Sequence, residues 1–151
     1  MKKLLALVCL LAAGTGPLWA QKAGEFGAGV VLGSPTGITG KYWLNGSRAL
    51  DGGLGFDSDV LVYGDYLWHS YKVLPQPAEG KMPLYLGLGL QVGDTHRHSD
   101  NDLGLRAVGG ISYWLPRNPI ELFFELVPVF NISEHGGSEL NAGVGLRYYF
   151  L

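Results

Sequence analysis

Apolar and polar residues alternate along most of the chain with a period of two, which is the period of a β-strand and not of a helix. Eight segments show this alternation, and pieces rich in Gly, Pro, Asn, Asp and Ser separate them. No helical stretch of the kind that joins parallel strands lies between the segments, so the pattern predicts an antiparallel meander closed into an up-and-down barrel. The predicted strands are 24–33, 38–44, 49–57, 60–72, 83–93, 103–115, 120–132 and 140–151.

The two faces of these strands differ in bulk and polarity. In the fifth predicted strand, alternate positions from Leu84 to Val92 are all Leu or Val, whereas the other face carries Tyr85, Gln91 and two glycines. A face made of glycines and isolated polar groups is too small for a packed soluble core, but it suits the narrow lumen of an eight-stranded barrel. The apolar face is therefore predicted to point outward into lipid, as in a transmembrane β-barrel.

The first twenty residues are typical of a secretory signal peptide. Lys2 and Lys3 precede an apolar run over 4–13, and Gly14, Gly16 and Pro17 follow it. This run is about half the length of the roughly 20 residues that a spanning helix needs. Cleavage after Ala20, with a competing site after Gly14, divides the chain into a signal peptide (1–20) and an outer-membrane barrel domain (21–151).

Composition limits the chemistry that the exported chain can perform. The chain has 151 residues, of which 16% are charged, and this leaves room for one domain. Without residues 1–20 it carries nine Lys and Arg against thirteen Asp and Glu, a net charge of −4, so nothing indicates nucleic-acid binding. Cys9, the single cysteine, is lost with the signal peptide, because the residues before it do not favour a lipoprotein cut.

Aromatic residues recur near one end of alternate strands. In four predicted strands a polar residue immediately precedes a tyrosine, which places the polar residue in the lumen and the ring on the outer face. Such rings form the aromatic belt of a membrane barrel at the lipid–water interface. The predicted interfacial aromatics are Tyr42, Tyr66, Trp68, Tyr113, Tyr148 and Phe150.

The end of the chain carries a short motif, Gly145-x-x-Tyr148-x-Phe150. It resembles the C-terminal assembly signal of bacterial outer-membrane barrels. Leu151 follows Phe150, whereas the aromatic residue is usually the last one.

Several stretches resemble a family of small, uncharacterised bacterial outer-membrane β-barrel proteins, which in turn resembles the barrel domain of outer membrane protein A. The likeness rests on 33–37, 40–44, 65–69, 83–87, 121–128 and 140–150, and it extends over essentially all of the barrel domain. The resemblance implies the barrel fold and the outer membrane. It brings no catalytic motif.

The inward-facing positions collect bases and acids in nearly equal number. The predicted lumen charge network comprises Glu25, Lys41, Asp51, Asp65, His69, Arg106, Glu121, Glu125 and Arg147, with Gln91 and Asn131 between them. Unpaired charges in so narrow an interior would carry a large desolvation penalty, so we expect Arg–carboxylate pairs that close the lumen, above all Arg147 with Glu25 or Glu121. The alternative is a gated polar path in which these pairs exchange partners.

An enzymatic interpretation would rest on His69 and Ser70, because some outer-membrane barrels of this size process lipid acyl chains with Ser, His and a carboxylate. Adjacent residues of a strand face opposite sides, and the sequence has no G-x-S-x-G elbow. We therefore predict that the chain is not an enzyme. His69 is expected to hydrogen-bond to a carboxylate in the lumen.

Two further features concern predicted loops and one strand. His96 and His98, with Glu134 and His135 in a second loop, have side chains that ligate zinc or copper, but their spacing is not diagnostic and Arg97 disfavours a cation. Solvated loops are favoured, and no metal or other cofactor is predicted. Pro128 cannot donate to a strand ladder, so it predicts a bulge in the seventh strand.

The sequence thus predicts a small barrel in the bacterial outer membrane, with both ends of the barrel domain in the periplasm and a structural or surface-interaction role. Its predicted partners are outer-membrane lipid and, during biogenesis, periplasmic chaperones and the barrel-assembly machinery; a monomer is expected. One alternative is a narrow pore or a lipid-acting enzyme. Another is a soluble periplasmic barrel around an apolar ligand, which requires the opposite polarity of the wall.

Overall fold

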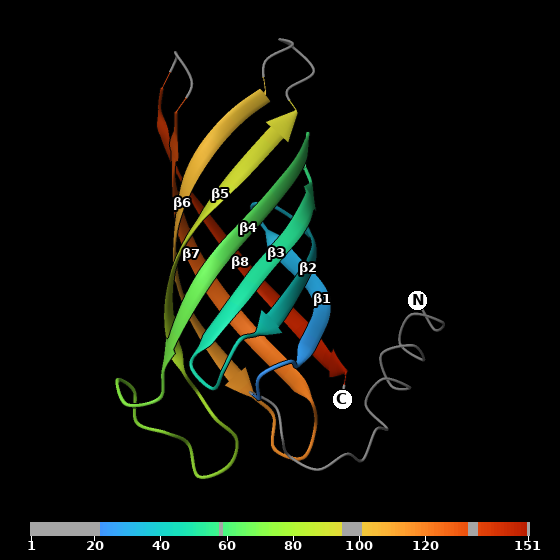
Figure 1. Ribbon diagram of the computed structural model, residues 1–151, viewed down its shortest axis with the longest axis vertical. Helices are drawn as coiled ribbons and strands as arrows, with labels where there is room; N and C mark the ends of the chain where they lie inside the picture. Colours follow the sequence, from blue (N-terminus) through green and yellow to red (C-terminus); the bar gives the residue numbers. More distant parts are fainter. Residues whose placement is uncertain (1–21, 58, 95–100, 133–135, 151) are drawn as a thin grey trace.

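A computed structural model describes residues 22–57, 59–94, 101–132 and 136–150, and these residues form eight antiparallel strands (Figure 1). The strands are β1 (Phe26–Gly33), β2 (Gly37–Trp43), β3 (Arg48–Phe56), β4 (Val60–Ser70), β5 (Leu84–Asp94), β6 (Asn101–Trp114), β7 (Ile120–Asn131) and β8 (Ser138–Phe150). Each predicted strand is confirmed. The bounds differ at the ends: β4 stops two residues earlier than predicted, and β8 begins two residues earlier.

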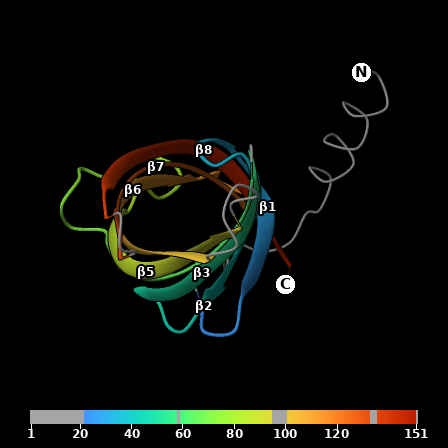
Figure 2. The same cartoon turned by 90° about the horizontal axis from the view of Figure 1, so that it is seen from above.

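The sheet closes on itself. Each strand pairs with its neighbour along the chain, and β1 pairs with β8 from Phe26 opposite Phe150 to Gly33 opposite Gly143. Figure 2 shows the closed ring seen from above. Closure leaves no strand edge with unpaired N–H and C=O groups, which is the condition for a sheet that lies in hydrocarbon. The predicted up-and-down meander is confirmed.

The two ends of the barrel differ in what they carry. At one end, called the terminal end, the chain enters β1 and leaves β8, and the connections β2–β3, β4–β5 and β6–β7 lie there (Figure 1). The opposite end carries the other connections. The predicted signal peptide, the predicted loop histidines and Leu151 lie outside the described residues. No helix among the described residues has the length and apolarity needed to cross a membrane.

Alternation separates the two faces, with an apolar surface outside and the buried charged groups inside. Along β5, Leu86, Leu88 and Leu90 are exposed, while Tyr85 and Gln91 on the other face are buried. The outer faces of the other strands are likewise apolar, and this is the polarity of a barrel that meets lipid. Their inner faces combine charged groups with rings and with buried aliphatic side chains such as Leu67, Val108 and Val129. A soluble barrel around an apolar ligand has the reverse polarity, so this alternative does not fit the wall.

The lumen holds more bulk than the sequence pattern predicts. Four inward aromatic rings each lie over the glycine directly opposite on the neighbouring strand, so that a Cβ on that glycine would collide with the ring. The pairs are Tyr149 with Gly27, Tyr63 with Gly53, Tyr85 with Gly110, and Phe123 with Gly145. The inward glycines therefore make room chiefly for rings, and not only for long polar side chains as the sequence pattern predicts.

The predicted bulge at Pro128 is wrong. Arg106 pairs with Val129, and three residues further along both strands Gly109 pairs with Leu126, so neither strand contains an extra residue. Proline lacks an N–H and removes ladder bonds toward β6 without shifting the register. Pairing of β7 with β8 continues through Pro128, opposite Leu140.

A charge on the outer face tests the polarity of the wall. Leu88 lies near the middle of β5 and is 56% exposed. We expect Leu88→Lys to lower the free energy of unfolding in lipid vesicles by about 2–4 kcal/mol, the cost of a lysine at the bilayer midplane. Urea titration followed by tryptophan fluorescence measures this change. Val73→Lys, in the β4–β5 connection, is the matched control because Val73 is equally exposed but lies outside the strands. Equal tolerance of both substitutions would contradict the lipid-facing assignment.

Candidate functional site

The candidate site is the lumen, where side chains from all eight strands meet. Three groups of residues occupy it. We call them the ion-pair layer (Lys41, Asp51, Asp65, Arg106, Glu121, Glu125 and Arg147), the aromatic floor toward the terminal end (Trp43, His69, Tyr85, Trp114 and Tyr149), and the pocket at the opposite end.

Arg147 is the centre of the ion-pair layer. Its guanidinium, 1% exposed, bonds to Asp51 on β3 and to Glu121 on β7 at 3.3 Å, and it lies 3.9 Å from Glu125. Thr39 accepts a further bond from the same group at 2.9 Å, and the guanidinium carbon lies 3.8 Å from the Phe123 ring centroid. The predicted pairing with Glu121 is present. The other predicted partner, Glu25, is buried where the chain enters β1.

The Glu121 carboxylate pairs with two bases, Lys41 and Arg147. Its side chain is fully buried, and it accepts hydrogen bonds from Lys41 Nζ at 2.9 Å, from Arg147 at 3.3 Å and from the Tyr149 hydroxyl at 2.8 Å. Glu121 and Arg147 lie directly opposite each other on β7 and β8. Lys41 reaches it across the lumen from β2, with its ammonium 4.9 Å from the Tyr85 ring. A charged group held by three donors and two cations is fully compensated despite its burial.

A second ion pair spans β5. Asp65 on β4 and Arg106 on β6 both lie level with Gly89, and Arg106 Nε donates to Asp65 at 2.9 Å. A Cβ on Gly89 would collide with the Asp65 carboxylate, so a glycine at this position lets the pair form over the intervening strand. Arg106 also donates to the Gln91 amide oxygen at 3.0 Å and lies over the ring of Tyr63.

The aromatic floor closes the lumen toward the terminal end. The His69 ring lies 4.4 Å from that of Trp43 and 5.0 Å from that of Tyr85, and the Trp114 ring lies 4.5 Å from that of Tyr149. Neither nitrogen of His69 has a hydrogen-bond partner among the described residues. The predicted bond between His69 and a carboxylate is therefore wrong: the ring packs, tilted, between two aromatic rings and is not paired with an acid.

Tyr71 follows β4 at this end. Its hydroxyl is buried without a hydrogen-bond partner among the described residues. Desolvation by burial, followed by the negative charge of Glu121, raises the pKa of this hydroxyl above its ordinary value of 10.0. The phenol therefore stays neutral and adds no charge at the terminal end of the barrel.

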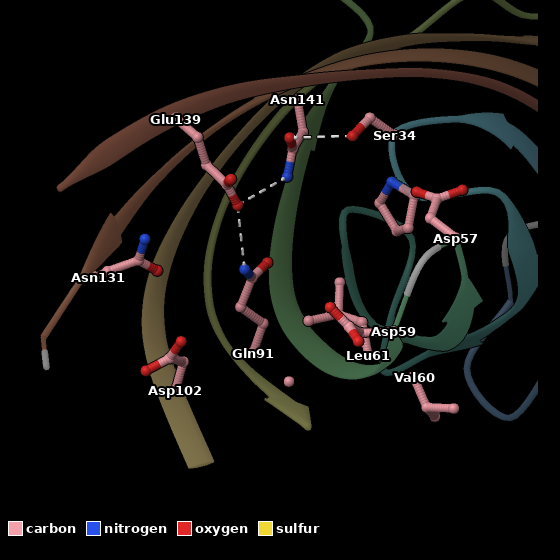
Figure 3. A pocket seen from close by; sticks show the side chains of 12 residues that line it. Ser34, Asp57, Asp59, Val60, Leu61, Gln91, Asp102, Asn131, Glu139 and Asn141 are labelled. Atoms are coloured by element: carbon pink, nitrogen blue, oxygen red, sulfur yellow. Dashed lines mark hydrogen bonds between the residues drawn. The ribbon is translucent and has the colours of Figure 1, made fainter. Parts of the chain in front are cut away.

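The opposite end opens into a pocket of about 250 Å³ (Figure 3). Carboxylates of Asp57, Asp59, Asp102 and Glu139 line it together with amides. Glu139 accepts weak bonds of 3.5 Å from Gln91 and Asn141. Gln91 also accepts the bond from Arg106, so the inner wall of the pocket is the start of the ion-pair layer. Asn131, placed in the lumen by the sequence, lines this pocket.

The six predicted interfacial aromatics occupy one level of the barrel, whereas Phe56 and Phe130 face outward near the opposite end. Tyr42, Trp68 and Phe150 are exposed, and Tyr66, Tyr113 and Tyr148 are partly exposed on the same face; all six lie near the terminal end of their strands. The residues of the C-terminal motif lie in β8, where Gly145 faces the lumen under Phe123 while Tyr148 and Phe150 face outward.

Sequence reasoning missed the aromatic side of the lumen. Trp43, Tyr63, Trp114 and Phe123 are all buried inward, and each contacts an ion pair or another ring. The sequence contains the information needed to find them, because strand alternation shows that each of these rings points inward. Within the described residues, no group of three or more His, Cys, Asp and Glu side chains has the arrangement of a metal site.

No protein-family model matches the chain, and no curated protein matches it. Solved structures are similar in fold. The N-terminal β-barrel domain of Pseudomonas aeruginosa OprF has a TM-score of 0.56 at 19% identity, with 83% of this chain and 96% of that one covered. A de novo designed transmembrane β-barrel has a TM-score of 0.55 at 20% identity, with 86% and 98% covered. The fold is therefore that of a transmembrane β-barrel.

Glu121 and Lys41 test whether the ion-pair layer is energetically coupled. We expect Glu121→Gln to lower the free energy of unfolding by about 3–5 kcal/mol, because it leaves the buried Lys41 ammonium without a carboxylate. The double variant Lys41→Met/Glu121→Gln removes that charge and is expected to cost less than Glu121→Gln alone. Urea titration in vesicles gives both values; a double variant less stable than Glu121→Gln would contradict the coupling.

His69 provides a test of the floor. Because His69 makes no side-chain hydrogen bond to the described residues and packs between two rings, His69→Phe is expected to change the free energy of unfolding by less than about 1.5 kcal/mol. His69→Asp is the contrasting variant, since it adds a carboxylate beside buried rings. A large loss with phenylalanine would show that a polar partner of the imidazole matters for folding.

Proposed function

We propose that the protein is a small outer-membrane β-barrel with a closed lumen and a structural or surface-interaction role. The observation that carries this proposal is the ion-pair layer: Lys41, Arg106 and Arg147 each pair with a buried carboxylate, and their side chains fill the middle of the barrel. A narrow eight-stranded lumen filled in this way leaves no continuous aqueous path.

The proposed orientation places the terminal end in the periplasm and the acidic pocket outside the cell. The motif of Gly145, Tyr148 and Phe150 then serves recognition by the barrel-assembly machinery, after periplasmic chaperones have carried the exported chain. The outward aromatics fit the lipid–water interface of the inner leaflet of that membrane. The apolar wall needs no protein partner, which favours a monomer.

A catalytic role receives no support from the geometry at His69. The imidazole lies inside the barrel between rings, whereas Ser70 belongs to the outer face, where its hydroxyl accepts a bond from the Lys72 N–H. A nucleophile and its base need to lie within hydrogen-bond reach of each other. We therefore propose a non-enzymatic protein.

A second candidate function is a narrow, gated pore. Arg147 lies close to three carboxylates at once, so it can move from Asp51 and Glu121 toward Glu125 without becoming an unpaired charge. Such an exchange is the step that a gated polar path requires.

Conductance in planar bilayers separates the two candidates. We expect neither the wild-type protein nor Arg147→Ser to give a steady ionic current, because Arg147→Ser leaves the aromatic floor in place. Arg147→Ser/Trp114→Ala opens both layers and is expected to give a cation-selective current, because three carboxylates remain. Arg117→Ser, in the β6–β7 turn outside the lumen, is the control and is expected to behave like the wild type. A heat-dependent shift in gel mobility verifies folding of each variant. Well-defined opening and closing steps of the wild type would favour the gated pore.

A further inference from the structure

The connections at the two ends of the barrel carry opposite charge. At the terminal end, five exposed bases lie just before β1, at the start of β3, and on the β4–β5 and β6–β7 connections. We call them the basic collar: Lys22, Arg48, Lys72, Lys81 and Arg117. Glu79 is the one exposed acid among the described residues there. At the opposite end, by sequence, the connections and their flanking residues carry Asp57, Asp59, Asp94, Asp100, Asp102, Glu134 and Glu139 against Arg97.

The basic collar directly follows the outward aromatics. Arg48 lies opposite Trp68 in the β3–β4 ladder, and Lys72 follows Trp68 by four residues along the same chain segment. Trp68 is 44% exposed, and its ring lies 4.8 Å from that of Tyr66 on the same outer face. Two cations therefore border an exposed aromatic pair at the level where the apolar wall ends.

The backbone around these bases is held in place. The Asn45 side chain accepts bonds from the N–H groups of Ser47 and Arg48, both at 2.9 Å, which fixes the turn that presents Arg48. No ion pair joins Arg48 or Lys72 to a carboxylate of the described residues. Both cationic groups are thus available to an external anion.

We propose that Arg48 and Lys72 bind the phosphate of an anionic glycerophospholipid, whose acyl chains lie along Trp68, Tyr66 and the apolar wall below them. Charge complementarity selects this occupant. An anionic lipid has a negatively charged headgroup that can meet the two cations, and it has apolar chains that can lie along the apolar wall next to them. The acidic opposite end repels the same lipids, so the charge difference favours one orientation between leaflets of different composition. This inference rests on the proposed membrane location.

Quenching of Trp68 by brominated-chain lipids provides a local test. Among the described residues Trp68 is the one outward tryptophan, since Trp43 and Trp114 are buried in the lumen. The full chain with Trp19→Phe is reconstituted into phosphatidylcholine vesicles that contain either brominated phosphatidylglycerol or brominated phosphatidylcholine. We expect an excess of phosphatidylglycerol beside Trp68 of roughly fivefold for each contributing base, which falls toward unity at about 1 M salt.

Two variants locate the effect. Arg48→Gln/Lys72→Gln is expected to abolish the preference for phosphatidylglycerol, whereas Arg117→Gln removes one collar charge on the β6–β7 turn and is expected to leave it unchanged. A preference that survives Arg48→Gln/Lys72→Gln, or a wild type that shows none although both brominated lipids quench Trp68, would overturn the lipid site and leave the membrane barrel intact. Absence of quenching by either lipid in a folded sample would overturn the membrane location itself.

Discussion

Closure of β1 onto β8 is the constraint on which the rest of the structure depends. With no free edge, every strand has two neighbours, and strand alternation sorts all side chains into one outer and one inner environment. Eight strands leave a narrow interior. Any charge that alternation directs inward therefore loses water and must find a partner within a few ångströms, and four of the inward rings fit because a glycine lies directly opposite each of them.

Three of the ion pairs join strands that the backbone ladder does not pair. Lys41 and Glu121 lie on β2 and β7, Arg147 and Asp51 on β8 and β3, and Arg106 and Asp65 on β6 and β4, so each pair connects strands that are not neighbours. The ladder itself places Asp51 opposite Asp65, two like charges side by side. Separate arginines compensate the two carboxylates, which explains why the layer needs two guanidinium groups and not one.

The strands, their order and their two faces follow from the sequence because a period of two is a local property. The pair of Glu121 with Arg147 also follows, since both alternate inward on consecutive strands. The remaining contacts depend on curvature and register: Asp51 approaches Arg147 only across the lumen, and Asp65 meets Arg106 only because Gly89 lies between them. The packing of His69 between two rings and the unshifted register at Pro128 were not predictable for the same reason, because each depends on neighbours that are distant in sequence.

Two separate layers of side chains, the ion-pair layer and the aromatic floor, lie across the lumen, and a solute that crosses the barrel has to pass both. Moving Arg147 toward Glu125 would leave it paired, but it would lose the Thr39 bond and its stacking on Phe123. The same movement leaves the aromatic floor untouched, since Trp43, Trp114 and Tyr149 pack against one another below the ion pairs. Opening the floor means exposing rings that are almost completely buried, with a cost set by apolar area and not by charge. A path through the barrel would therefore require two physically unrelated rearrangements at once, and this supports the proposal of a closed lumen over that of a gated pore.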